Sequence, residues 1–180
     1  GVWMCLGRAQ EKTGEPIPLD PRQPLLQAVA KARSMGLEPR AAGELEFYLL
    51  DPVTGRPRED RPECYGLARA AELEPVLGPV RRNLAAMGVP VEQSNPEFSA
   101  GQVEVNLRHA PTLEAADHTL LLRGMIKQMV RPMGLVASFM AKPFHDRSGN
   151  GFHVHHSLWR DGRNAFATDG GLSDEGRWFL

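Results

Sequence analysis

Apolar and polar residues alternate most regularly between residues 43 and 50. Three apolar side chains, at Leu45, Phe47 and Leu49, alternate there with Glu44, Glu46 and Tyr48. Successive side chains of a strand point to opposite faces, so the pattern predicts a strand with an apolar face and an acidic face. The two carboxylates would stand roughly 7 Å apart on one face. Like charges at that distance repel, and a divalent cation would offset the repulsion. Hydration on a solvent-facing strand is the alternative.

Two further strands joined by a loop are predicted over residues 89–107. The apolar positions of the second strand are Val103, Val105 and Leu107, and Gln102, Glu104 and Asn106 face the other way. The acids Glu92, Glu97 and Glu104 lie on or between these strands. Together with the acids of residues 43–50 they predict a carboxylate-rich face, which suits Mg²⁺ or Mn²⁺ better than zinc.

Histidines are concentrated in a third alternating stretch, residues 152–159. On a strand, His153, His155 and Ser157 would point to one side, and Phe152, Val154 and Leu158 to the other. This pattern is typical of a strand with one face in a core and one face in a site. Neutral imidazole ligates metals near pH 7. A solvated strand face is the alternative reading of the same pattern.

Helical spacing and turn residues define the remaining elements. We expect helices over residues 24–37, 68–87 and about 112–131, a loop over 51–66 and a buried strand over 135–140. The first helix is expected to pack on a core. The second is expected to be interrupted or turned near Pro75 and Pro79, and Thr112 is expected to cap the third.

Composition restricts the class of protein. The chain has 180 residues, 42% of them hydrophobic and 24% charged, which predicts a globular domain with a sizeable core. Its net charge of -1 gives no sign of a nucleic-acid or anionic-membrane partner. There is no apolar run of the ~20 residues that a membrane helix needs, and no signal peptide pattern. Cys5 and Cys64 lack metal-ligand spacing, so a reduced, cytoplasmic protein is expected, with a disulfide between them left open.

Both ends of the chain suggest a segment of a larger polypeptide. The chain starts with a strand-like Gly1-Val2-Trp3 and stops at residues 173–180, where Ser173 followed by acids and apolar residues indicates the start of a helix. We therefore expect residues 1–180 to be part of a catalytic domain that continues beyond them.

Several spaced motifs together resemble the catalytic domain of the glutamine synthetase family. Gly43-Glu44-Leu45-Glu46-Phe47 is similar to its first metal-ligand strand, and residues 97–104 are similar to its Glu…Gly-Gln-x-Glu segment. Residues 139–143 followed by 149–155 resemble its Phe-Met-x-Lys-Pro…Gly-x-Gly-x-His-x-His signature. The resemblance covers residues 36–159 and rests on the order of these motifs.

The resemblance implies an α+β fold, in which a curved, mostly antiparallel sheet has acids on one face and helices on the other. It implies two cation sites for Mg²⁺ or Mn²⁺, one at Glu46, Glu97 and Glu104 and one at Glu44 and His153. It also implies nucleotide contacts at Glu92, His155 and Ser157, and a loop at Gly149 that receives the substrate glutamate.

The activity that the resemblance implies is ATP-dependent ligation of glutamate to ammonia through γ-glutamyl phosphate. A polyamine or another primary amine is the alternative acceptor, because the wording of residues 101–107 and 139–143 resembles the γ-glutamylpolyamine and γ-glutamylamine ligase branch. Asn95-Pro96, in place of a histidine doublet often found before the metal-binding glutamate, is a departure from the family pattern. The family's sites form between subunits of a ring, so we expect a homo-oligomer and an inactive isolated segment. A non-catalytic relative and a metallohydrolase are the rival readings.

Overall fold

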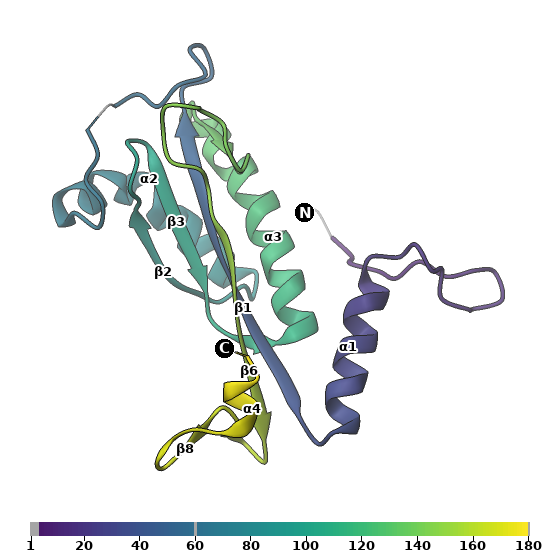
Figure 1. Ribbon diagram of the computed structural model, residues 1–180. Coiled ribbons are helices and arrows are strands. Elements are labelled where there is room, and N and C mark those ends of the chain that lie inside the picture. The colour runs from purple at the N-terminus through teal and green to yellow at the C-terminus, as the bar shows by residue number, and fades with distance from the viewer. Residues whose placement is uncertain (1–3, 60, 180) are drawn as a thin grey trace. The chain divides into compact units, whose positions relative to one another are not determined.

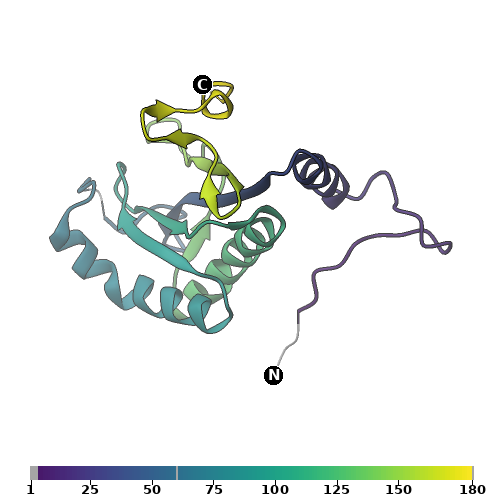
Figure 2. The ribbon, with the colours of Figure 1, turned by 90° about the horizontal axis from the view of Figure 1, so that it is seen from below.

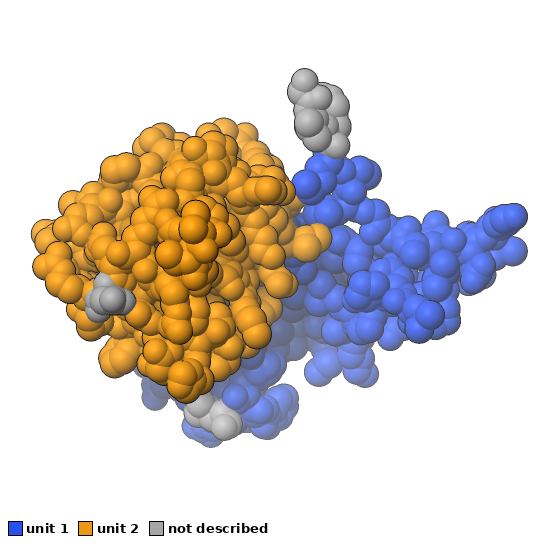
Figure 3. Space-filling view, turned by 90° about the horizontal axis from the view of Figure 1, so that it is seen from above, with its two compact units in different colours: residues 1–41, 110–117, 156–180 blue, residues 42–109, 118–155 orange. Residues whose placement is uncertain are grey.

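The computed structural model describes residues 4–59 and 61–179, so the strand expected at Gly1-Val2-Trp3 lies outside the described residues. The chain divides into two compact units (Figure 3). One contains residues 1–41, 110–117 and 156–180, and the other contains residues 42–109 and 118–155. Most residues of the predicted site belong to the second unit, so that unit is described first.

A sheet centred on β1 (Glu38–Leu50) forms the framework of the second unit (Figure 1). Its other strands are β2 (Val91–Pro96), β3 (Gln102–Leu107), β5 (Val136–Ser138) and the start of β6 (Phe152–Arg160). β1 lies between β3 and β6, and β2 follows on the far side of β3. The pairings of β1 with β3 and β5, and of β2 with β3, are antiparallel.

Two helices, α2 (Leu67–Ala86) and α3 (Thr112–Val130), lie on the same side of β2 and β3 (Figure 2). A short 3-10 turn (Arg131–Met133) follows α3. The core between the helices and the sheet is built from the predicted apolar positions, including Phe47, Val103 and Val105, which are fully buried. Burial of their apolar surface stabilises this arrangement. The expected fold is confirmed: α+β, with a curved, mostly antiparallel sheet and covering helices.

The first unit contains α1 (Arg22–Ser34) and several short elements. These are β4 (Ala110–Pro111), β7 (Arg163–Asn164), β8 (Ala167–Thr168), β9 (Gly171–Leu172) and α4 (Asp174–Arg177). β4 pairs with the start of β1, β7 with the end of β6, and β8 with β9. The side chain of Ser173 accepts a hydrogen bond from the Gly176 amide at 3.0 Å, so the predicted cap of the last helix is confirmed.

The predicted interruption of the second helix is wrong. α2 continues through both Pro75 and Pro79. Each proline removes one backbone donor, and the two are one turn apart, so the affected carbonyl groups lie on one side of the helix. Pro75 is exposed, and water can satisfy the carbonyl groups on that side. Buried Leu77 and Leu84 hold the helix on the sheet.

Other expectations fail where they depended on contacts. Thr112 is the first residue of α3, and its buried hydroxyl has no hydrogen-bond partner, so it does not cap the helix as predicted. α1 has no buried residue. The strand expected over residues 135–140 is reduced to Val136–Ser138.

The expected core face of the histidine strand is not formed either. Phe152 and Val154 are 61% and 55% exposed. The alternation of β6 is present, but of the three apolar side chains only Leu158 is partly buried. Among the described residues, no helix is long and apolar enough to cross a membrane. Cys5 and Cys64 are both exposed free thiols.

Candidate metal centre and active site

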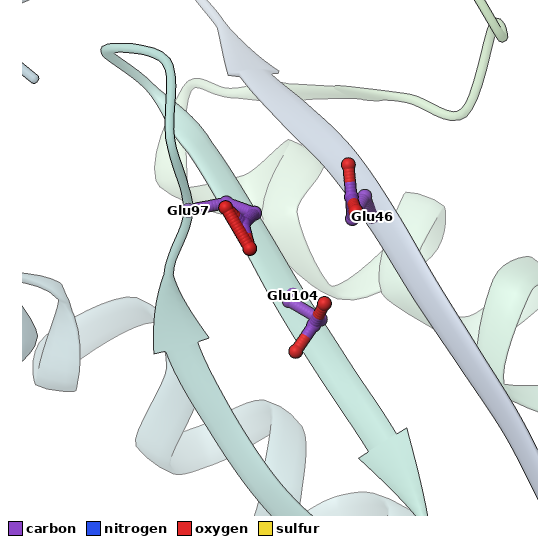
Figure 4. Close-up of side chains that lie close together, drawn as sticks. All are labelled: Glu46, Glu97 and Glu104. Carbon is purple, nitrogen blue, oxygen red and sulfur yellow. The ribbon is translucent and has the colours of Figure 1, made fainter. Parts of the chain in front are cut away.

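Three carboxylates converge on the face of the sheet opposite the helices. Glu46 and Glu104 are direct neighbours across the β1–β3 pairing, and Glu97 follows the end of β2 (Figure 4). Each offers an oxygen atom within 4.8 Å of the oxygens of the other two. The antiparallel register produces this cluster. It sets Glu46 opposite Glu104, and Glu97, whose amide donates to the Gln102 carbonyl oxygen at 2.9 Å, continues the pairing of β2 with β3.

The cluster is electrostatically strained without a cation. Glu104 is only 5% exposed. Its burial raises its pKa, and the negative charges of Glu44 and Glu97 raise that pKa further, against the opposing hydrogen bond from the Asn106 amide. Oxygen-rich clusters of this kind are ligands that Mg²⁺ and Mn²⁺ prefer. The residues present therefore fit a divalent cation at this point.

Glu97 is held by two residues of the loop before α2 and by the amide of the residue that follows it. The Tyr65 hydroxyl donates to Glu97 Oε1 at 3.2 Å, the Cys64 thiol lies 3.8 Å from Oε2, and the Phe98 amide also donates to Oε2. The charge of Glu97 is the main reason that the pKa of Tyr65 rises to about 12. Tyr65 has a φ of 56°, which a non-glycine residue seldom adopts. This support was not predicted, because the loop has no periodic pattern.

Glu44 contacts two histidines of β6 directly. Its Oε1 lies 2.6 Å from His153 Nδ1 and its Oε2 lies 2.9 Å from His155 Nε2. Burial favours a higher pKa for Glu44, but the hydrogen bonds with the two imidazoles outweigh it and lower that pKa. The same contact with Glu44 raises the pKa of His153. The structure therefore brings together Glu44 and His153, the residues predicted for a second cation, and adds His155 to them.

The residues predicted to contact a nucleotide each have surroundings of their own within their unit. Glu92 is exposed at a bulge of β2 and lines a cavity of about 300 Å³ with Arg81 and Ser94. His155 bonds to Glu44. Ser157 belongs to the other unit, where its hydroxyl accepts a hydrogen bond from Trp159 Nε1 at 2.9 Å. Their shared role stays a prediction.

The predicted substrate loop passes directly over the acid face. A Cβ atom at Gly149 would lie 2.7 Å from the Ala141 carbonyl oxygen, closer than real Cβ atoms approach, so only glycine fits. The Gly149 carbonyl oxygen accepts a hydrogen bond from the side chain of Gln102, and the Gly151 amide donates to Glu46. The loop and the metal-ligand strand are thus joined by hydrogen bonds.

Sequence reasoning placed Gln102 on the acid-bearing side of β3 but gave it no role. Tyr48 was placed on the acid face of β1, again without a role. The strand alternation was the available signal, since it puts both side chains on the face of Glu46 and Glu104. The alternation could not show that a loop covers that face and leaves both side chains almost fully buried.

The chain belongs to the glutamine synthetase family. A family model described as the glutamine synthetase catalytic domain matches residues 18–180. The fold, the order of the motifs and the three-acid cluster agree with that assignment.

Several relatives are similar to the chain over more than nine tenths of its length. The chain is 35% identical to a glutamate–isopropylamine ligase from a Pseudomonas species over 95% of its length, and 35% identical to a glutamine synthetase of Thermotoga maritima over 93%. It is 37% identical to the gamma-glutamylpolyamine synthetase GlnA3 of Streptomyces coelicolor over 92%. The chain covers 40%, 40% and 36% of these three proteins, so it spans about two fifths of their length.

Solved structures agree with the fold. A crystal structure of a glutamine synthase homologue matches with a TM-score of 0.84 and 33% identity, over 94% of this chain and 40% of that one. A complex of GmaS with ADP matches with a TM-score of 0.82 and 32% identity, over 89% of this chain and 39% of that one.

Proposed function

We propose that the protein containing this chain is an ATP-dependent ligase that joins the γ-carboxyl group of glutamate to an amine. The convergence of Glu46, Glu97 and Glu104 carries the proposal, because clustered carboxylates need a strong cationic partner. Mg²⁺ and Mn²⁺ are such partners, and they accompany the phosphates of ATP in phosphoryl transfer. The structural similarity to a protein solved with ADP supports the nucleotide.

The proposed reaction has two steps. A γ-carboxylate oxygen of glutamate attacks the γ-phosphorus of ATP, ADP leaves, and γ-glutamyl phosphate forms. The amine nitrogen then attacks the acyl carbon, phosphate leaves with the former carboxylate oxygen, and the nitrogen loses a proton to give the amide. A cation held by Glu46, Glu97 and Glu104 would neutralise the crowded phosphate charge.

The side chains of this chain hold and orient the reactants. Glu44 and His153 are proposed ligands of a second cation, beside the cluster of three acids. The segment at Gly149 is proposed to receive glutamate, because its backbone adjoins Gln102 and Glu46. Nucleotide contacts are proposed at Glu92, His155 and Ser157.

Ammonia is the acceptor that we propose first, and a primary alkyl amine or polyamine is the second candidate. The second is favoured by a specific observation: relatives that are 35% and 37% identical are named for isopropylamine and polyamine ligation.

A phosphate-release assay on the full-length protein tests the proposal. ATP, glutamate and Mn²⁺ are combined with ammonia, isopropylamine or a polyamine, and the expected result is phosphate release that requires an amine. Glu97→Gln should abolish it, whereas Glu38→Gln, an exposed acid on β1 paired with Arg33, should not change it. Phosphate release that is independent of amine and glutamate would contradict a ligase.

The same assay separates the rival functions. A metallohydrolase that uses the same acids would act without nucleotide, and a non-catalytic relative would bind Mn²⁺ without turnover. We further propose that residues 1–180 act as part of a longer catalytic domain within a homo-oligomeric ring, and that the isolated segment is inactive. Ligation by the isolated 180 residues would contradict that part of the proposal.

A further inference from the structure

One buried side-chain amide connects the acid cluster to the loop that covers it. Gln102 lies on β3, is 2% exposed, and is the partner of Tyr48 in the β1–β3 register. Its Oε1 accepts a hydrogen bond from the Ser99 amide at 3.2 Å. That bond fixes the orientation of the amide, because it leaves the nitrogen pointing to the other side.

The nitrogen of Gln102 has more acceptors than hydrogens. Its Nε2 lies 2.9 Å from Glu46 Oε2, 2.9 Å from the Gly149 carbonyl oxygen and 3.0 Å from Asn150 Oδ1. A primary amide has two N–H groups. The three acceptors therefore share two hydrogens, and a change in the position of Glu46 alters how strongly the loop is held.

Glu46 is attached to the loop a second time. The Gly151 amide donates to the same Oε2 atom at 2.9 Å, and the Glu46 amide donates to the Gly151 carbonyl oxygen at 3.1 Å. A Cβ atom at Gly151 would lie 2.8 Å from Glu46 Oε1. With Oε2 occupied by both donors, Oε1 is the oxygen left to face a cation.

Residues 148–151 are held together by further hydrogen bonds, so a change at one of them affects the others. Tyr48, which is fully buried, donates to the Ser148 carbonyl oxygen at 2.8 Å. The Asn150 side chain donates to the carbonyl oxygens of Ser138 and Met140 at 3.2 and 2.8 Å. Residues 148–151 thus form one connected network, and two groups link it to the carboxylate of Glu46: the Gly151 amide and the side chain of Gln102, which alone also reaches Gly149 and Asn150 among the described residues.

We propose that Gln102 is a positioning residue that couples cation binding at Glu46 to the conformation of residues 148–151. A cation that fixes Glu46 fixes the amide of Gln102, and the amide then holds Gly149 and Asn150 in place. By reciprocity, an ordered loop raises the affinity for the cation. The inference rests on the proposed function, because both the cation site and the role of Gly149 belong to it.

Mn²⁺ titration by calorimetry, on the full-length protein, tests the first half of the coupling. Gln102→Met keeps the length of the side chain and removes its hydrogen bonds, and we expect about tenfold weaker Mn²⁺ binding, as for other residues that orient metal ligands. Gln128→Met, at an exposed position of α3, is the matched control and should bind as the wild type does.

Hydrogen exchange of the amides of residues 148–151 tests the second half. In the wild type, Mn²⁺ should slow exchange at Asn150 and Gly151, whose amides donate to the Ala141 carbonyl oxygen and to Glu46. Gln102→Met should lose this response to Mn²⁺. A residue with a merely structural role would lower protection equally with and without the ion.

Asn150→Ala provides a second variant in case the buried substitution prevents folding. It removes the loop's side-chain bonds without touching an acid, and reciprocity predicts about fivefold weaker Mn²⁺ binding. Unchanged Mn²⁺ affinity in a folded Gln102→Met or Asn150→Ala variant would overturn the coupling while leaving the ligase intact. Absence of Mn²⁺ binding by the wild type would instead overturn the proposed function.

Discussion

The charge of Glu104 should destabilise the metal-free protein and stabilise the metal-bound one. Replacing it as Glu104→Gln keeps the carbonyl oxygen that accepts from Asn106 at 3.2 Å and removes one negative charge from the cluster. The substitution should therefore raise the free energy of unfolding without a cation, and remove most of the stabilisation that Mn²⁺ gives to the wild type. Few substitutions of a buried residue act in these two opposite directions.

The magnitude follows from the spacing of the acids. The acids offer oxygens within 4.8 Å of one another, and two unit charges at that limit repel by roughly 3.5 kcal/mol at an effective dielectric constant of about 20. Glu46 and Glu97 are partly exposed, so water and salt reduce the net effect, and we expect a gain of about 1–2 kcal/mol. In a chain of this size that corresponds to a rise in Tm of roughly 2–8 °C.

The assay is thermal unfolding of the wild type and Glu104→Gln, each in EDTA and in excess Mn²⁺, with Glu38→Gln as the control. The pH dependence gives an independent check. Because the pKa of Glu104 is raised in the folded state, its contribution is complete below the ordinary pKa of 4.5 and is lost as pH rises through the folded value. In Glu104→Gln the free energy of unfolding should fall less steeply as pH rises through this range. A lower Tm in EDTA together with an undiminished Mn²⁺ response would refute the reasoning.

Three further predictions concern the ligands and their supports. His153→Ala should weaken one class of Mn²⁺ site about tenfold in calorimetry and leave the three-acid site unchanged. NMR titration of the metal-free protein should show the pKa of His153 above 6.5, and the stability that its contact with Glu44 gives should be lost as pH rises through the folded-state pKa of His153. Tyr65→Phe removes a donor to Glu97, so Mn²⁺ affinity should fall severalfold, and a fall no larger than in the exposed-site control Gln128→Met would contradict this role. Gly149→Ala forces a Cβ to within 2.7 Å of a backbone carbonyl oxygen, so the KM for glutamate should rise at least tenfold, whereas an unchanged KM would show that the loop does not receive this substrate.

The strand faces were predictable because the side-chain period of a strand is fixed. Alternation alone placed Glu46 and Glu104 on one face and Phe47 and Val103 on the other, and the structure agrees. The prediction that Glu97 lies near Glu104 required only that the two neighbouring strands pair in the antiparallel sense. Local patterns therefore determined most of the sheet and the centre of the candidate site.

The rest depends on contacts between distant residues. Gln102 has a role only because residues 148–151 fold over its face, more than 40 positions later in the chain. Glu44 meets His155 as well as His153 because both histidines lie on the face of β6 that turns toward it. Helix α2 keeps its course through two prolines because its buried side holds it against the sheet. No local pattern carries such information.

An isotope-transfer experiment on the full-length protein tests the central claim most directly. Glutamate labelled with ¹⁸O in its γ-carboxyl group is incubated with ATP, Mn²⁺ and the preferred amine, and the released phosphate is analysed by mass spectrometry. A ligase that acts through γ-glutamyl phosphate transfers one labelled oxygen to each phosphate, in step with amide formation. Phosphate that carries no label would contradict the account, because the oxygen would then have come from water.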